Sequence, residues 1–162
     1  MWNNRIRLIA SAIIRQRIVR HEDVALLRDL TLIYGGISRD EAGDLVRIER
    51  HVTNISSDWP SFFTETLTSH LIWESRPTGT LTIYDAEWLS LRLGLSSVGP
   101  SQCSQALIDA LASESHDPDH VRTLFAVIAG QAKPVLRPTP PVPSGDNIML
   151  FPSRVYRAGF SA

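Results

Sequence analysis

The residues of this chain that could bind a metal ion are concentrated in one short run. His116 and His120 are four positions apart, with Asp117 and Asp119 between them. Imidazole and carboxylate groups at this spacing can hold a divalent metal when they share one helical face. Pro118, however, is typical of the first turn of a helix, which places His116 before that helix and off the face of His120. The run therefore predicts a solvent-exposed helix start.

The other reactive side chains have no partner nearby in the sequence. His51 and His70 stand on predicted helices beside apolar residues, as histidines at the edge of a core do. Cys103 has no basic neighbour, and we expect a partly buried helix residue there. The chain contains no glycine-rich phosphate loop, no Gly-x-Ser-x-Gly and no His-Glu-x-x-His sequence. We therefore predict no catalytic, cofactor-binding or metal-binding residues, and no enzyme.

Three arginines, Arg39, Arg47 and Arg50, indicate another chemistry, which is contact with phosphate groups. Residues 21–51 would then form a helix-turn-helix around Gly35 and Gly36, with these arginines facing DNA. The same helix carries four acids, which oppose contact with DNA: Asp40, Glu41, Asp44 and Glu49. A DNA-binding regulator is therefore the alternative hypothesis, and nucleic acid is not the favoured partner.

Length and charge describe the whole chain. Its 162 residues and mean hydropathy of −0.03 are ordinary for one globular domain, and no run approaches the roughly 18 apolar residues of a membrane span. Residues 1–20 hold five arginines and no acid, whereas residues 21–132 hold seven arginines against sixteen acids. Residues 133–162 are basic again. We predict a cytoplasmic protein with a single helical domain at 1–132, an acidic body and basic ends.

One pattern that positions these residues recurs three times. An aliphatic residue is followed by an acid four places on, a small apolar residue five places on and a leucine eight places on. The copies begin at Val19, Ile37 and Leu81, and their acids are Asp23, Glu41 and Asp85. Each copy joins an extended residue to the first turns of a helix, where an acid caps free amides and complements the helix dipole. The repeat predicts stacked helix-loop-helix units.

Apolar spacing and helix signals predict seven helices, at about 3–16, 22–34, 38–52, 59–71, 85–93, 101–113 and 118–130. In the second helix we expect Val24, Leu27, Leu30 and either Leu32 or Ile33 on the buried side. Asp58 is expected to cap the fourth helix. Phe62 and Phe63 are adjacent, so one of them is expected to face a neighbouring element or a partner.

The first helix has two interpretations. Trp2, Ile6, Ile9 and Ile13 recur at spacings of four, three and four, which predicts one apolar face packed on the core. The alternative is an amphipathic helix at a membrane surface, which the arginines and Trp2 would also suit. Membrane contact through residues 1–20 is the less favoured of the two.

The repeat resembles the second half of EF-hand loops. Gly-Gly-Ile-Ser-Arg-Asp-Glu-Ala and Gly-Thr-Leu-Thr-Ile-Tyr-Asp-Ala place glycine, aliphatic residue and acid in that register. The first half, which would supply calcium ligands, is missing. Over residues 19–115 the chain resembles an uncharacterised bacterial family of small EF-hand-like or TerB-like helical proteins. The resemblance implies an all-α fold of duplicated helix pairs, 37–71 and 81–111, without calcium binding.

The C-terminal region differs in composition. Five prolines among residues 133–145 predict an extended strap over 133–146. Residues 147–162 regain apolar side chains, and we expect this tail to dock on its own domain or on a partner. The sequence therefore predicts a non-enzymatic protein interaction module that engages a protein partner through this tail or through the acidic helical surface.

Overall fold

A computed structural model describes residues 5–131 of the chain, which form seven α-helices and a π-helical segment. The predicted strap and tail lie outside these residues. The elements in chain order are α1 (Arg5–Gln16), β1 (Ile18–Val19), α2 (His21–Tyr34), α3 (Arg39–His51), β2 (Asn54–Ile55), α4 (Trp59–Thr68), η1 (Ser69–Glu74), α5 (Ile83–Leu93), α6 (Gln102–Glu114) and α7 (Pro118–Gln131). The prediction of an all-α fold is confirmed.

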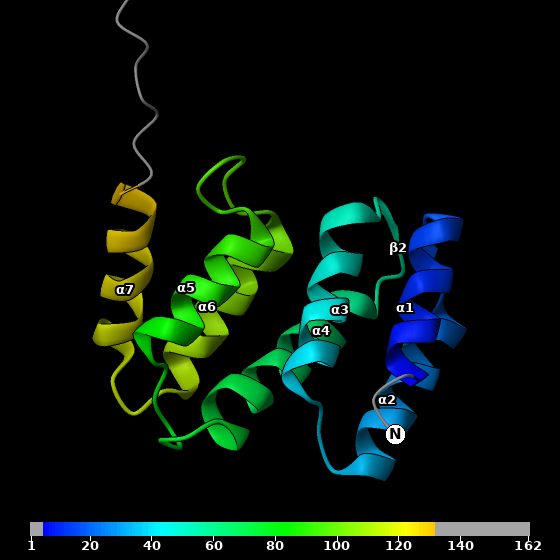
Figure 1. Ribbon diagram of the computed structural model, residues 1–162, viewed down its shortest axis with the longest axis horizontal. Coiled ribbons are helices and arrows are strands. Elements are labelled where there is room, and N and C mark those ends of the chain that lie inside the picture. The colour runs from blue at the N-terminus through cyan, green and yellow to red at the C-terminus, as the bar shows by residue number, and fades with distance from the viewer. Residues whose placement is uncertain (1–4, 132–162) are drawn as a thin grey trace, which may run out of the picture.

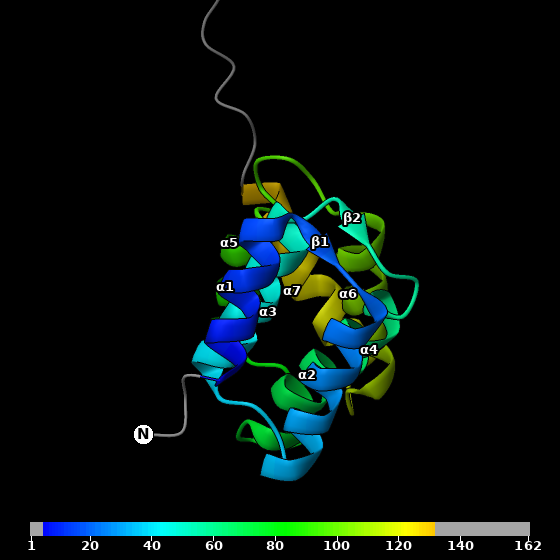
Figure 2. The ribbon, with the colours of Figure 1, turned by 90° about the vertical axis from the view of Figure 1, so that its right-hand side faces the viewer.

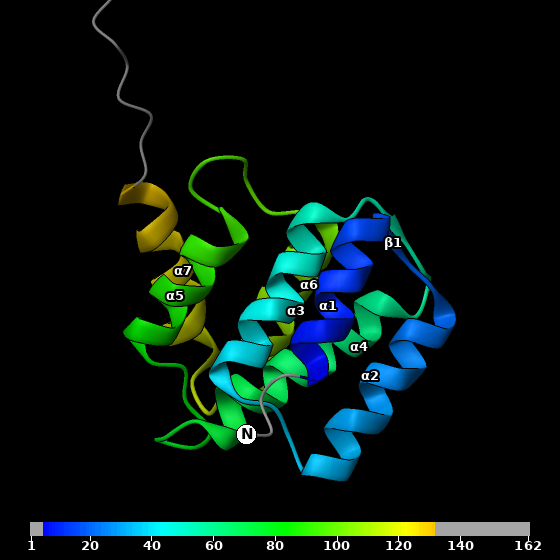
Figure 3. The same ribbon diagram turned by 45° about the vertical axis from the view of Figure 1, so that its right-hand side comes forward.

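The helices stack as pairs along the long axis of the molecule (Figure 1). Helices α1, α3 and α5 pack side by side in one row, and α2, α4 and α6 pack in a second row. Helix α7 contacts both α5 and α6 and closes the end of the stack. Figure 3 shows α3 lying between α1 and α5. The sequence repeat therefore describes how successive helix pairs are laid against one another.

The acids of the repeat start helices, as predicted. Asp23, Glu41 and Asp85 each occupy the third position of their helix. The Glu41 carboxylate accepts a hydrogen bond from the backbone N–H of Ser38 at 2.8 Å, and Asp23 accepts one from that of Arg20 at 2.9 Å. These bonds satisfy amides that the helix itself leaves without an acceptor.

A short parallel pairing ties two of the helix links together. β1 and β2 align Ile18 with Asn54 and Val19 with Ile55 (Figure 2). Val19 is the first aliphatic residue of the first repeat copy. The equivalent residues, Ile37 and Leu81, are buried but lie outside the strands. The first copy therefore adds a strand contact to the shared helix start.

The largest core residues come from the start of α4. Trp59, Phe62 and Phe63 are each no more than 1% exposed. As expected, one of the two phenylalanines faces a neighbouring element, and both are buried because α4 lies between α2 and α6. Phe62 faces α2, where the Arg28 guanidinium lies 5.7 Å from its ring centre. Phe63 stacks on Trp59 at 5.6 Å.

Two details of helix ends differ from the prediction. Asp58 precedes α4, but its carboxylate makes no capping hydrogen bond and pairs with the ring of His21. Helix α5 begins at Ile83, two residues earlier than expected, because the Thr82 hydroxyl accepts the backbone N–H of Asp85 at 3.2 Å. The Thr82 hydroxyl therefore caps the start of α5, whereas Asp58 does not cap α4 because its carboxylate pairs with His21.

The buried face of α2 is also narrower than predicted. Val24 and Leu27 are buried, but Leu32 and Ile33 are 73% and 71% exposed. The inward row continues to Thr31, seven positions after Val24, and the next two residues are rotated away from it. Two large aliphatic side chains therefore face solvent at the end of α2.

Helix α1 packs on the core, as its periodicity predicts. Ile6, Ala10 and Ile13 are buried at 3% exposure or less, against α2 and α3. Within residues 5–131, every helix falls short of the length and apolarity needed to cross a membrane. The apolar face of α1 thus serves the interior of the domain.

Candidate functional site

A hollow lies on each side of the link between α2 and α3. The first has a volume of about 500 Å³ and the second about 330 Å³. Gly35, Gly36, Ile37 and Glu74 line both hollows, so we treat them as one feature and call it the loop groove. The groove is framed by α1 and α3 on one side and by α4 and η1 on the other.

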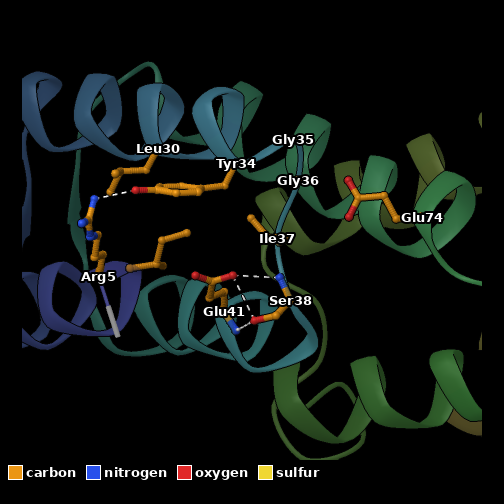
Figure 4. Close-up of a pocket in the computed structure, with 10 residues that line it drawn as sticks. Arg5, Leu30, Tyr34, Gly35, Gly36, Ile37, Ser38, Glu41 and Glu74 are labelled. Carbon is orange, nitrogen blue, oxygen red and sulfur yellow. Dashed lines mark hydrogen bonds between the residues drawn. The ribbon is translucent and has the colours of Figure 1, made fainter. Parts of the chain in front are cut away.

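The first hollow has both polar and apolar walls (Figure 4). Arg5 donates to the Tyr34 hydroxyl at 2.5 Å at its edge in Figure 4, while Leu30 and Ile37 contribute aliphatic walls. Glu41 lies at its floor, held by the N–H and hydroxyl of Ser38 at 2.8 and 2.9 Å. The hollow can therefore receive an apolar group while its carboxylate stays fixed.

The second hollow has an aromatic floor and a charged rim. The buried Phe62 ring contributes to its lining, and the ion pair between Arg28 and Glu65 spans 3.1 Å. Leu32 also contributes to this lining although 73% of its surface is exposed. An exposed leucine next to a hollow is a typical contact for another apolar surface.

The absence of a side chain at Gly36 allows the Glu74 carboxylate to line both hollows. Its φ of 134° is outside the range that other residues readily adopt, and an added Cβ would lie 2.7 Å from Oε1 of Glu74. Glu74 is oriented by Nδ1 of His70 at 3.2 Å and by the hydroxyl of Ser69, which donates at 3.4 Å. The carboxylate therefore reaches the backbone of the α2–α3 link, as Figure 4 shows.

The predicted DNA-facing arginines lie along α3, and each already has a protein contact. Arg39 donates to Oδ1 of Asp85 at 2.6 Å and Arg47 to Oδ1 of Asp44 at 3.2 Å. Arg50 donates to the backbone carbonyl of Arg92 at 3.3 Å. These contacts turn the three arginines toward α5 or along α3 itself. The helix-turn-helix function stays an alternative prediction.

The four acids of α3 are divided between different surroundings. Glu41 caps the helix, and Glu49 accepts the indole N–H of Trp59 at 2.8 Å and the hydroxyl of Ser101 at 3.0 Å. Asp40 and Asp44 remain beside the arginines. Only two of the four acids of α3 therefore lie beside its arginines, so this face is less acidic than the sequence suggests.

The histidines do not converge on one site. His116 precedes α7 and packs against Gly79 and the edge of the Trp73 ring, whereas the backbone N–H of His120 donates to Asp117 at 3.0 Å. His70 is 8% exposed at the edge of the core, as expected, but His51 is exposed. Across residues 5–131, no three metal-ligating side chains are gathered.

Cys103 is partly buried in α6, as predicted. Burial raises the pKa of its thiol to about 12, and the charge and hydrogen bond of Glu49 add to this increase. The thiol is therefore almost entirely protonated at neutral pH and is a poor nucleophile.

The loop groove could not be located from sequence reasoning, although two of its signals were visible. The Gly35-Gly36 pair marked the end of a helix, and the adjacent Leu32-Ile33 pair exceeded what one buried face could hold. Comparisons of the chain with protein-family models, curated proteins and solved structures give no significant match. The function is therefore inferred from the geometry.

Proposed function

We propose that this protein is a non-enzymatic interaction module whose loop groove receives an apolar protein segment that carries basic residues. The main support is the exposure of Leu32 and Ile33 beside two hollows that together exceed 800 Å³, from about 500 and about 330 Å³. Such apolar surface at a concave site favours a protein ligand that inserts side chains.

The charges of the groove specify the ligand further. Glu41, Glu65 and Glu74 line it together with Arg5 and Arg28. Arg28 is already paired with Glu65, and Arg5 contacts Tyr34. Because Arg28 is paired with Glu65, the lining holds one more carboxylate than guanidinium group, which favours an incoming arginine or lysine over an incoming acid.

The chain itself contains a segment of this chemistry. Residues 147–162 hold apolar side chains, Arg154 and Arg157, and no acid. These residues lie outside the described structure, so they are offered as a ligand by composition. A partner protein with a similar segment would satisfy the same groove.

Photo-crosslinking in the full chain tests the proposal. Benzoylphenylalanine replaces Leu32 at the groove, and in a matched control it replaces Leu91, which is 78% exposed on α5. Mass spectrometry should map crosslinks from position 32 to an apolar, basic segment, either residues 147–162 or a segment of an identified partner. Equal crosslinking from positions 32 and 91, or capture of segments without this composition, would contradict it.

A further inference from the structure

A separate hollow, away from the loop groove, lies between α1, α3 and α5 and is lined by several arginines. Its volume is about 290 Å³, and its lining includes Arg7 from α1, Arg39 and Arg47 from α3 and Arg92 from α5. Asp40 and Asp44 are the two acids of the lining. We call this feature the arginine pocket. Helices far apart in the sequence therefore bring four guanidinium groups to one small space.

Two of these arginines are held in place by neighbouring groups. Arg39 is bonded to Asp85, which is 8% exposed, and its Cζ lies 4.0 Å from the centre of the Trp88 ring. Arg47 is bonded to Asp44, which is 6% exposed. A guanidinium that is both stacked and ion-paired keeps a fixed orientation. The pocket thus has a preorganised wall.

The other two arginines have no direct ion-pair partner, although the Asp40 carboxylate lies in the same lining. Within residues 5–131, Arg7 and Arg92 have no carboxylate at ion-pair distance. Arg92 instead lies 6.0 Å from the Trp88 ring centre, on the same indole as Arg39. Guanidinium groups gathered in a partly enclosed space repel one another and raise the electrostatic potential there, and a bound anion would reduce this repulsion.

Helix α3 carries a buried glycine at this point. Gly43 faces the pocket, where an added Cβ would come within 3.8 Å of the Trp88 ring and 3.9 Å of Nη1 of Arg92. These are ordinary van der Waals distances, so the indole and the guanidinium already lie against the helix at Gly43. The Arg39 guanidinium covers the face of the Trp88 ring, so this indole holds an arginine in place and that face is not free to stack on an aromatic ligand.

We propose that the arginine pocket binds a phosphate dianion, either inorganic phosphate or the phosphomonoester of a small molecule. Four guanidinium groups against Asp40, Asp44 and Asp85 leave an excess of one positive charge around the pocket. Arg7 and Arg92 have no ion-pair partner among the described residues, and arginine forks fit phosphate oxygens in pairs. A volume of about 290 Å³ is at the lower limit of small-molecule sites, which suits a phosphate group with a small polar remainder.

Calorimetric titration of the full chain tests this site. Inorganic phosphate and glycerol phosphate are titrated at constant ionic strength, with sodium acetate as the reference anion. We expect saturable binding of both phosphates with one ligand per chain, together with an increase in Tm that acetate does not produce. Absence of saturable phosphate binding at concentrations up to about 10 mM would overturn the proposal.

Matched charge variants identify the residues. Arg7→Gln and Arg92→Gln should each weaken phosphate binding about tenfold or more. Arg15→Gln is the control. Arg15 is exposed on the same helix as Arg7, and this substitution removes the same charge outside the pocket. Arg92→Lys keeps the charge but loses the fork, and an intermediate affinity is expected even if the glutamine variant folds poorly. Equal weakening by Arg15→Gln would overturn the site.

Duplex DNA provides the remaining arm of the experiment. If the pocket recognises a dianion, DNA should bind weakly, with a dependence on Arg7 and Arg92 no greater than on Arg15. Tight DNA binding that competes with phosphate and depends steeply on salt would overturn the small-ligand proposal and support the helix-turn-helix alternative.

Discussion

The loop groove and the arginine pocket share the first turn of α3 but use it in opposite ways. Ser38 and Glu41 line the groove, whereas the intervening Arg39 and Asp40 line the pocket. In the groove, the glutamate side chains are bonded to neighbouring protein groups. In the pocket, two guanidinium groups have no acid partner among the described residues. The groove combines apolar walls with glutamates that are held by neighbouring groups, whereas the pocket is polar and contains arginines without an ion-pair partner.

This contrast has energetic consequences. Polar groups in the groove stabilise the fold, so changing them should cost stability. The unpaired arginines of the pocket repel one another in the ligand-free protein, so removing one should cost little stability and much anion affinity. Variants on the two sides of α3 therefore test whether the division of roles is real.

The largest effect is expected at Gly36, on the groove side. Gly36→Val should lower the free energy of unfolding by about 3 kcal/mol, because φ of 134° strains a branched residue and its Cβ would meet the Glu74 carboxylate. Gly35→Ala is the control, since nothing lies within 4 Å of its added Cβ and only the φ of 68° is unfavourable, at about 1 kcal/mol. Urea unfolding measures both. Equal losses would show that contact with Glu74 does not matter.

A smaller effect is expected at the structural wall of the pocket. Asp85→Asn should cost about 2 kcal/mol, because it leaves the Arg39 guanidinium unpaired and weakens the bond with the Thr82 hydroxyl at 2.6 Å. Asp119→Asn, which loses an exposed pair with Arg122, should change stability by less than about 0.5 kcal/mol. Similar losses in thermal unfolding would contradict a special role for Asp85.

An effect near zero is expected at the unpaired charge. Arg92→Gln should leave the free energy of unfolding within about 0.5 kcal/mol of the parent, with any gain confined to low salt. The backbone carbonyl that accepts from Arg50 remains in this variant. Unfolding measured at two NaCl concentrations checks this. A loss above about 1 kcal/mol would make Arg92 a structural residue like Asp85.

The helical starts of this fold were predictable because they depend on local chemistry. Ser38 with Glu41, and Asp117 with Pro118, act within one turn of the chain, so the sequence contains the whole interaction. Two helix starts were still predicted imperfectly. The Thr82 cap of α5 is local but was overlooked, and Asp58 pairs with the distant His21 instead of capping α4.

The candidate sites followed the same rule. Arg39, Arg47 and Arg50 were singled out from the predicted helix; the structure places Arg39 and Arg47 in the arginine pocket, whereas Arg50 bonds to the Arg92 carbonyl. Arg7, Trp88 and Arg92 were missed, because their proximity arises only when α1 and α5 pack on either side of α3. In the sequence, Glu49 was one of four acids that oppose contact between this helix and DNA. In the structure, it instead accepts hydrogen bonds from Trp59 and Ser101, away from the arginine pocket.

The position of Glu49 leads to the last prediction. Because the pKa of Cys103 is raised to about 12, alkylation by iodoacetamide at pH 8 should be far slower than for an ordinary thiol. The folded thiol keeps its proton above pH 9 while the unfolded thiol loses it, so this group stabilises less as pH rises from about 9 to about 12. Glu49→Gln removes the charge and should speed alkylation, whereas Arg92→Gln should not. If Arg92→Gln changed the rate as much, Glu49 and the arginine pocket would form one electrostatic unit, and the separation of the two faces of α3 would be wrong.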